Sequence, residues 1–251
     1  MSSEYTTLKT QDIEQKRVLS LSGERRSLYV FAKRAMDIVL AAVGLILLAP
    51  LLLYVALRIK FEDGGPALFV QNRVGLNGES FKIYKFRSMV LNADEALEAW
   101  KRDHPDLFEQ YVLNNFKLRE DPRITRIGRF IRSTSIDELP QLINVLKGDM
   151  SLVGPRPLLS RELPTYGSAL DAYVRVRPGI TCIWQVSGRS ATTFEDRIRF
   201  DVEYVERVSL LTDLRILFKT VKVVSDLPAK WQWFVPILSR SPQSCSFAGN
   251  R

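Results

Sequence analysis

The feature that most constrains this chain is an apolar run from Ile38 to Leu57. It contains 20 residues and no charge, which is long enough to cross a bilayer as one helix. We do not expect a cleaved signal peptide, because 37 residues precede the run and no small-residue cleavage site follows it. A helix that is apolar on all sides over this length is also unusual in a soluble core. The run therefore predicts a membrane-embedded segment.

Pro50 divides this run into two arms. A proline inside a helix removes a backbone hydrogen bond and kinks the axis. The arm before Pro50 would be roughly 18 Å long and the arm after it roughly 12 Å, so a straight helix just spans a hydrocarbon core of about 30 Å. If the helix bends at Pro50, each arm reaches only about halfway across.

Basic residues flank the run on both sides. Lys33 and Arg34 precede it, and Arg58 and Lys60 follow it, so the positive-inside rule gives no direction of crossing. Equal basic flanks suit a segment that enters and leaves by the same face. We therefore expect a re-entrant membrane helix hairpin over residues 29–60, and a spanning helix is the alternative.

The rest of the chain has the composition of one globular domain. The 251 residues are 46% hydrophobic and 25% charged, with a net charge of +8, which excludes a disordered polymer and a multi-span membrane protein. Two cysteines exclude a disulfide framework and a four-thiolate zinc site. The single histidine, His104, lies in a polar run and is expected at the surface. The chemistry must therefore depend on carboxylates, arginine and lysine.

We expect a mostly α fold with a small β element, divided into a tail over 1–28, the membrane hairpin, one cytoplasmic catalytic domain over 61–226 and a tail over 227–251. Residues 231–238 of the second tail suit either a membrane interface or the domain surface. The expected strands lie near 67–71 and 81–89, with a turn between them at Gly75 and Gly78. The expected helices lie near 92–102, 106–118, 126–132, 140–147, 193–208 and 211–226. Helix 126–132 should begin at the N-cap Thr125. Its apolar side should be Ile127, Phe130 and Ile131, and its arginine side Arg126, Arg129 and Arg132.

Several common sites are absent from the sequence. There is no GxGxxG or GxxxxGK[ST] motif, so a dinucleotide fold and a P-loop are not supported. An Asp-x-Asp motif and a G-x-S-x-G elbow are also missing, which argues against a metal-dependent glycosyltransferase of the usual kind and against a serine hydrolase.

The most promising chemistry lies at Asp137 and Glu138. Pro140 and Gly148 delimit a short helix over 140–147, whose inward residues should be Leu142, Ile143 and Leu146. The two acids would then lie beside free N–H groups at its N-terminus, where they either complement the helix dipole or form a catalytic pair. In the second case one carboxylate attacks an electrophile while the other holds a divalent cation.

Basic residues near these acids favour the catalytic interpretation. The guanidinium group of arginine and the ammonium group of lysine bind phosphate oxygens well. The candidates for substrate contact are Arg132, Arg156, Lys82, Lys85 and Arg87. A carboxylate that attacks phosphorus while Mg²⁺ neutralises a diphosphate is coherent chemistry.

These segments resemble the bacterial sugar transferase family, which comprises monotopic phosphoglycosyl transferases. The likeness covers about residues 29–224 and is carried by KRAMDI (33–38), FKIYKFRSM (81–89), SIDELPQLINVLKGDMSLVGPRPLL (135–159) and RVRPGITCIWQVSGR (175–189). The resemblance implies a re-entrant helix hairpin in the inner membrane with a cytoplasmic catalytic domain. It also implies Mg²⁺-dependent transfer of a sugar 1-phosphate from a UDP-sugar to polyprenol (undecaprenyl) phosphate, with release of UMP, at the start of exopolysaccharide or O-antigen synthesis.

The resemblance also implies roles for individual residues. Asp137 would be the nucleophile that forms a phosphosugar intermediate, and Glu138 would be a Mg²⁺ ligand. The substrate-binding set would comprise Arg132, Asp201 and the Pro-Arg-Pro motif of Pro155, Arg156 and Pro157. The membrane and lipid-phosphate set would comprise Lys33, Arg34, Asp37 and Pro50.

Three residues after the RPGIT motif bear on specificity and strain. The family usually has glycine where this chain has Cys182, so a positive φ there would strain the loop; otherwise Cys182 is a small buried residue. Trp184 and Gln185 resemble family members that handle galactose or glucose, while Trp184 as a plain core aromatic is the other interpretation.

Other functions stay open at this point. The resemblance permits an N-acetylhexosamine-phosphate transferase or an idle scaffold of a polysaccharide assembly complex, and it leaves a homodimer open. A membrane-tethered nucleic-acid binder is not expected, because the basic residues are spread along the chain rather than gathered on one face.

Overall fold

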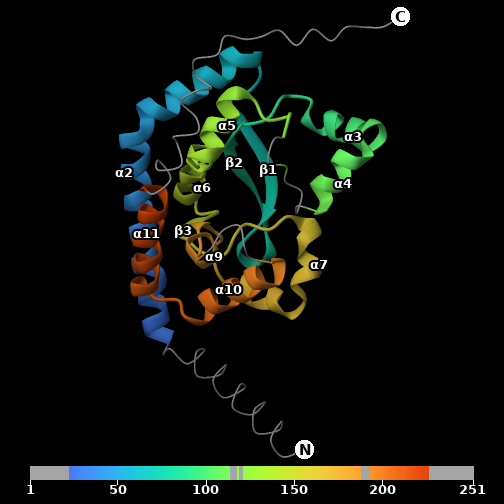
Figure 1. Ribbon diagram of the computed structural model, residues 1–251. Helices are drawn as coiled ribbons and strands as arrows, with labels where there is room; N and C mark the ends of the chain where they lie inside the picture. Colours follow the sequence, from blue (N-terminus) through green and yellow to red (C-terminus); the bar gives the residue numbers. More distant parts are fainter. Residues whose placement is uncertain (1–22, 114–117, 119–120, 188–192, 226–251) are drawn as a thin grey trace, which may run out of the picture.

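The computed structural model describes residues 23–113, 118, 121–187 and 193–225 of the chain (Figure 1). The predicted membrane-interface segment 231–238 and most of the first tail lie outside these residues. The fold is mostly helical with a small sheet, as predicted. Its helices are α2 (Gly23–Asp63), α3 (Ala93–Asp103), α4 (Pro105–Leu113), α5 (Arg126–Ser133), α6 (Gln141–Lys147), α7 (Leu163–Tyr166), α8 (Leu170–Tyr173), α9 (Ile183–Ser187), α10 (Phe194–Glu206) and α11 (Leu210–Ser225).

Two short sheets hold the strands. β1 (Leu68–Val74) and β2 (Ser80–Phe86) form an antiparallel hairpin whose turn contains the predicted glycines at 75 and 78. β3 (Ser151–Val153) and β4 (Gly179–Thr181) form a parallel pair. The pair β3–β4 brings the segment before Pro155 beside the segment that contains the RPGIT motif.

The apolar run lies within one long helix, α2. It begins at Gly23, earlier than predicted, and continues through Pro50 to Asp63, so two separate hairpin arms are not confirmed. In its part from Ser27 onward, only 11% of the most apolar 18-residue window is buried, which excludes the core helix of a soluble protein. Figure 1 shows α2 as a bowed helix along one side of the domain, beside α6 and α11.

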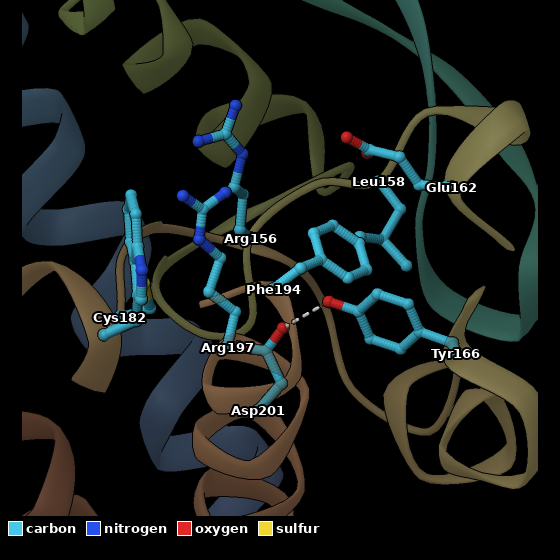
Figure 2. A pocket seen from close by; sticks show the side chains of 9 residues that line it. Arg156, Leu158, Glu162, Tyr166, Cys182, Phe194, Arg197 and Asp201 are labelled. Atoms are coloured by element: carbon cyan, nitrogen blue, oxygen red, sulfur yellow. Dashed lines mark hydrogen bonds between the residues drawn. The ribbon is translucent and has the colours of Figure 1, made fainter. Parts of the chain in front are cut away.

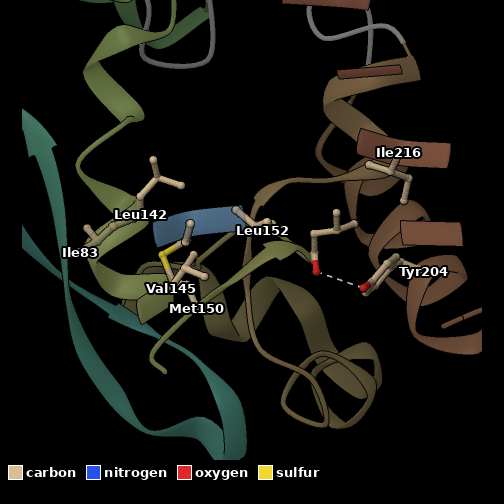
Figure 3. Close-up of a cluster of buried hydrophobic side chains, with 9 residues drawn as sticks. Ile83, Leu142, Val145, Met150, Leu152, Tyr204 and Ile216 are labelled. Atoms are coloured by element: carbon tan, nitrogen blue, oxygen red, sulfur yellow. Dashed lines mark hydrogen bonds between the residues drawn. The ribbon is translucent and has the colours of Figure 1, made fainter. Parts of the chain in front are cut away.

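A narrow stripe of α2 faces the domain. Ala41 belongs to a buried cluster with residues of β2, α6, β3, α10 and α11, most of which are labelled in Figure 3. Val55 and Ile59 belong to a second cluster with Phe86 and Ile131. The long helix therefore contacts both cores, while its remaining surface is exposed and apolar.

Helix α5 confirms its predicted pattern. Thr125 is the N-cap, and its Oγ1 accepts a hydrogen bond of 3.0 Å from the Gly128 N–H. Ile131 is fully buried and Arg129 is exposed, as the apolar period requires.

Helix α6 corrects the prediction of its inward face. Leu142 is buried, as expected, but Ile143 and Leu146 are 39% and 36% exposed. The other buried positions of α6 are instead Gln141, Asn144 and Val145. The reason is a polar contact that periodicity does not reveal: the Asn144 side chain bridges the backbone of β2 at Lys82 and Tyr84.

Candidate active site

The two acids lie on a single 3₁₀ turn, η2 (Ile136–Glu138), between α5 and α6. Ser135, directly before this turn, adopts a left-handed conformation with φ of 59°, which costs a residue with a side chain roughly 1–2 kcal/mol. Strained backbone of this kind persists where its surroundings determine it, and it occurs often at functional sites. The strain at Ser135 therefore marks the turn that carries Asp137 and Glu138.

Some of the backbone N–H groups that were predicted to be free beside the acids already donate hydrogen bonds to backbone carbonyls. The Leu142 N–H donates to the Leu139 carbonyl and the Ile143 N–H to the Pro140 carbonyl, at 3.0 Å in each case. Pro140 is the N-cap residue of α6 rather than its first residue. The prediction was wrong here because the 3₁₀ turn runs directly into the helix.

The charges around the dyad are closely coupled. Lys85 Nζ lies 2.8 Å from Glu138 Oε1. Burial and the neighbouring Glu138 carboxylate raise the pKa of Asp137 to about 6, against the opposing effect of Lys85 and Arg132. Asp137 is therefore ionised at neutral pH and more basic than an ordinary aspartate.

A cavity opens beside Glu138. Its lining includes the predicted Lys85, Arg156 and Pro157, together with Arg73, Gln141 and Gln185. The structure thus brings the dyad, β2 and the Pro-Arg-Pro motif to one place. Cationic side chains on both sides of a carboxylate pair suit a substrate with several phosphate oxygens.

A second cavity shares Arg156 with the first (Figure 2). Its lining also includes Trp184, Arg197 and Asp201. Asp201 is buried and accepts a hydrogen bond of 2.9 Å from the Tyr166 hydroxyl. Burial raises the pKa of Asp201 to about 7, although the hydrogen bond from Tyr166 opposes the change.

Some predicted substrate-binding residues lie elsewhere. Arg87 is buried and held by Asp63 and the Pro66 carbonyl at the end of α2, and it lines neither cavity. Lys82 is exposed and lies on the opposite side of β2 from Lys85, since it is three residues away on a strand. Arg132 is exposed at the end of α5 and acts on Asp137 through its charge.

The basic residues before the apolar run contact the domain. Lys33 Nζ lies 2.9 Å from the buried carboxylate of Asp213, and Arg34 donates to the last carbonyls of α6 at Val145 and Leu146. Asp37 is buried and accepts from the Leu152 N–H. These contacts join α2 to the domain, a role the sequence did not predict; contact with a lipid phosphate stays a prediction. Pro50 is exposed within α2.

The dyad fits Mg²⁺ only if the substrate contributes ligands. Among the residues that the structure describes, no group of three acid, histidine or cysteine side chains could hold a metal ion. Mg²⁺ usually binds one or two carboxylates together with substrate phosphates. The repulsion between Asp137 and Glu138, which raises the pKa of Asp137, is what a bound cation would relieve.

The chain matches the bacterial sugar transferase family over residues 28–226. The chain belongs to this family. It is 45% identical over 203 residues to the exopolysaccharide production protein ExoY of Rhizobium meliloti, covering 81% of this chain and 89% of that protein. It is 50% identical over 194 residues to the undecaprenyl-phosphate galactose phosphotransferase of Salmonella typhimurium, covering 77% of this chain and 40% of that protein.

A third relative differs in its sugar. The UDP-glucose:undecaprenyl-phosphate glucose-1-phosphate transferase of Escherichia coli K12 is 40% identical over 210 residues, which cover 80% of this chain and 41% of that protein. This chain therefore spans well under half of the Salmonella typhimurium and Escherichia coli proteins and most of the Rhizobium meliloti protein.

The family motifs meet through two glycines. Gly154 precedes the Pro-Arg-Pro motif and Gly179 lies in RPGIT; a Cβ on Gly179 would lie 2.7 Å from the Gly154 Cα and carbonyl oxygen. The Gly179 N–H also donates to the Pro155 carbonyl at 2.8 Å. In this sugar transferase the glycines allow two backbones to approach closely and so position Arg156.

The departure at Cys182 carries no strain. Among the described residues, the positive φ values outside glycine occur at Asn77 and Ser135, and Cys182 is buried. Burial raises the pKa of its thiol to about 12, so the residue stays protonated. His104 is exposed, as predicted.

Two arginines were missed from the sequence. Arg73 lines the cavity beside Glu138, and its guanidinium donates to the Pro157 carbonyl at 3.1 Å. Arg197 lines the second cavity and precedes Asp201 by four residues on α10, a spacing that places both on one helix face. That spacing could have identified Arg197, whereas the contact between β1 and Pro157 leaves no local signal.

Proposed function

We propose that this sugar transferase moves a sugar 1-phosphate from a UDP-sugar to polyprenol (undecaprenyl) phosphate, through an aspartyl phosphosugar intermediate and with release of UMP. The observation that carries the proposal is the dyad: Asp137, with its raised pKa of about 6, lies next to the Glu138–Lys85 pair. The names of the relatives support the class of donor and acceptor.

The chemistry proceeds in two displacements at one phosphorus. The Asp137 carboxylate attacks the phosphorus that bears the sugar, and the bond to the bridging oxygen breaks, so UMP leaves with that electron pair. A phosphate oxygen of the polyprenol then attacks the same phosphorus and releases the Asp137 carboxylate. A carboxylate with a pKa near 6 is ionised at neutral pH, so it can attack in the first step, and it is still a weak enough base to leave in the second.

The surrounding residues have separate tasks in this scheme. Arg156 would bind the nucleotide or its phosphates, while Lys85 holds Glu138 and, with Arg132, lowers the pKa of Asp137. Glu138 would hold Mg²⁺ together with phosphate oxygens of the substrate. When bound, Mg²⁺ supplies positive charge that neutralises the diphosphate.

Galactose or glucose is the sugar we propose. The relatives whose names state a sugar name galactose or glucose, and the Trp184–Gln185 pair lies between the two cavities: each residue lines one of them. An N-acetylhexosamine donor is the competing possibility. A panel of UDP-sugars, scored for UMP release, decides between them.

We further propose that α2 enters and leaves the inner membrane by its cytoplasmic face. Its long exposed apolar surface supports insertion. Nucleotide sugars are made in the cytoplasm, so the catalytic domain would lie on that side. The dyad then lies near the headgroups, where it can meet a lipid phosphate that remains in the bilayer.

An intact-mass measurement tests the nucleophile. The wild-type protein incubated with UDP-galactose or UDP-glucose alone should gain the mass of one hexose phosphate and release one UMP. Asp137→Asn should show neither, whereas Asp171→Asn, which changes an exposed carboxylate, should behave as wild type. No adduct on the wild type together with full activity of Asp137→Asn would refute the assignment.

The same assay tests the role of Glu138 and the scaffold alternative. Glu138→Gln should lower the rate and weaken the dependence on Mg²⁺; an unchanged dependence would place the metal ligand elsewhere. If no UDP-sugar yields UMP with the wild-type protein, an idle scaffold is the better interpretation.

A further inference from the structure

The second cavity, lined in part by α10 and by the segment that follows β3, holds two arginines over one aromatic ring. The Arg197 guanidinium lies 4.6 Å from the centre of the Trp184 ring, and the Arg156 guanidinium lies 5.8 Å from it. Figure 2 shows the two arginine side chains next to each other, reaching the same part of the cavity. Two like charges held this close repel each other, so the arrangement is costly unless an anion joins them.

The acids in this cavity do not balance the two arginines. Asp201 accepts from the Tyr166 hydroxyl and, because burial raises its pKa to about 7, it carries only part of a charge at neutral pH. Glu162 accepts a hydrogen bond from the Leu159 N–H at 2.7 Å and lies 4.0 Å from Arg73. Both acids attract Arg197, and Asp201 also attracts Arg156, but each acid is bonded to another group, so their charges offset the two arginines only in part.

Arg197 itself has spare donor capacity. Its Nε is buried and has no hydrogen-bond partner within the part of the chain that the structure describes. Burial and the charge of Arg156 lower the pKa of Arg197. A buried donor without a partner is destabilising, and an anion in the cavity would supply the missing acceptor.

We propose that Arg197 is a second phosphate-binding arginine, which acts with Arg156 on the phosphate of the departing nucleotide. The inference rests on the proposed function and adds a residue to its donor site. Arg156 lines both cavities, so a diphosphate can have the reacting phosphorus beside Glu138 and its other phosphate beside Arg197. When the bond to the bridging oxygen breaks, the electron pair stays on that oxygen, and Arg197 stabilises the added negative charge.

Equilibrium binding to the whole protein in detergent tests this assignment with three probes: UMP, uridine and a short polyprenyl phosphate. Arg197→Gln should weaken UMP binding about 10- to 100-fold, the loss of one hydrogen bond to a charged group, and leave uridine and polyprenyl phosphate unchanged. Arg197→Lys keeps the charge but loses the paired N–H donors of the guanidinium, so its affinity for UMP should lie between those of the wild type and Arg197→Gln.

Arg199→Gln is the matched control. Arg199 lies two residues further along α10, is 79% exposed in its side chain and pairs with Asp196, so its loss should leave UMP binding unchanged. Equal melting temperatures of the four proteins exclude a folding effect.

Three outcomes would overturn the inference. If Arg197→Gln weakens the binding of UMP and of uridine equally, Arg197 has a structural role. If it weakens only the binding of polyprenyl phosphate, the anion that Arg197 binds is the lipid phosphate. Unchanged UMP binding in Arg197→Gln would remove the contact altogether. If the wild type transfers no sugar phosphate while UMP binding still depends on Arg197, the proposed function fails and the phosphate site stands.

Discussion

Asp137 is a residue whose environment opposes its own charge. Burial and Glu138 favour the protonated form, and Lys85 and Arg132 favour the ionised form. The balance leaves a reactive carboxylate at neutral pH, at a cost in stability that the rest of the fold must offset.

Replacing Asp137 by asparagine should stabilise the protein at pH 7. The folded protein holds the Asp137 proton up to about pH 6, whereas an unfolded chain loses it about two pH units lower, so wild-type stability falls as the pH rises from about 4 to 6. Asp137→Asn lacks this penalty and should be more stable at pH 7 by at most about 3 kcal/mol. Unfolding in urea at pH 7 and at pH 4 measures the difference, which should be small at pH 4. An equal difference at both values of pH would contradict the raised pKa.

Lys85 should control the acid limb of the pH–rate profile. Because its charge lowers the pKa of Asp137, Lys85→Met should move the fall in kcat/KM to higher pH, besides lowering the rate. Lys82→Met, on the other side of the same strand, should leave the position of the limb unchanged. A limb that stays in place in Lys85→Met would show that another group titrates there.

At the scale of the elements, the parallel pair β3–β4 determines where the Pro-Arg-Pro motif lies. Gly179→Ala should push β4 away from Gly154, because the new methyl group would lie 2.7 Å from its Cα and carbonyl oxygen. We expect a loss of about 1–3 kcal/mol in stability and a larger loss of activity, as Arg156 shifts. Gly44→Ala is the control, since its Cβ would meet only the Leu142 side chain at 3.5 Å. Thermal melting and transfer assays measure both effects, and a fully active Gly179→Ala would show that the close approach is dispensable.

Pro50 should determine the topology of α2. A single cysteine at Ser3, in a background without Cys182 and Cys245, can be probed on intact cells with an impermeant thiol reagent. Protection in the Pro50 background and labelling in Pro50→Leu would support a re-entrant helix that the proline turns back, because the unbroken run is just long enough to span. Labelling from outside with Pro50 present would show that the helix spans.

Local patterns predicted the elements that local interactions determine. Helix α5 follows from its apolar period and Thr125 cap, and the β1–β2 hairpin from its glycine turn. The left-handed Ser135 and the contact of Gly154 with Gly179 were not predicted, because each depends on segments that meet only in the fold. The dyad and Arg156 were predicted from their motifs, and the spacing between Arg197 and Asp201 was a usable signal that the prediction missed. Arg73 could not be found locally, because its contact with Pro157 joins segments far apart in the sequence.

For the molecule as a whole, a buried polar cluster joins α2 to the domain. Asp213 is fully buried and accepts from Tyr29, Lys33 and Tyr204. The Tyr204 hydroxyl oxygen also lies 3.0 Å from the Val153 carbonyl oxygen, two residues before the Pro-Arg-Pro motif, so its single proton is shared between Asp213 and Val153. The cluster thus connects the apolar helix to the segment that carries Arg156.

Lys33→Met should destabilise the protein by about 3–5 kcal/mol, because it leaves a buried carboxylate without its cation. Adding Asp213→Asn to this variant should recover part of the loss, since the uncompensated charge is then gone. Melting temperatures of the single and double variants measure the coupling. Purely additive losses would show that Lys33 and Asp213 act independently.

The contacts of Arg34 and Asp37 have a consequence for anyone who wishes to produce the catalytic part as a soluble protein. Deleting the apolar helix α2 would expose the last carbonyls of α6, the helix that follows the dyad. It would also expose the Leu152 N–H of β3, the strand that precedes Arg156. A water-soluble redesign must therefore keep the inward stripe of α2 and change only its outward side chains, among them Val39, Ile46, Leu47 and Leu53, which are all more than half exposed.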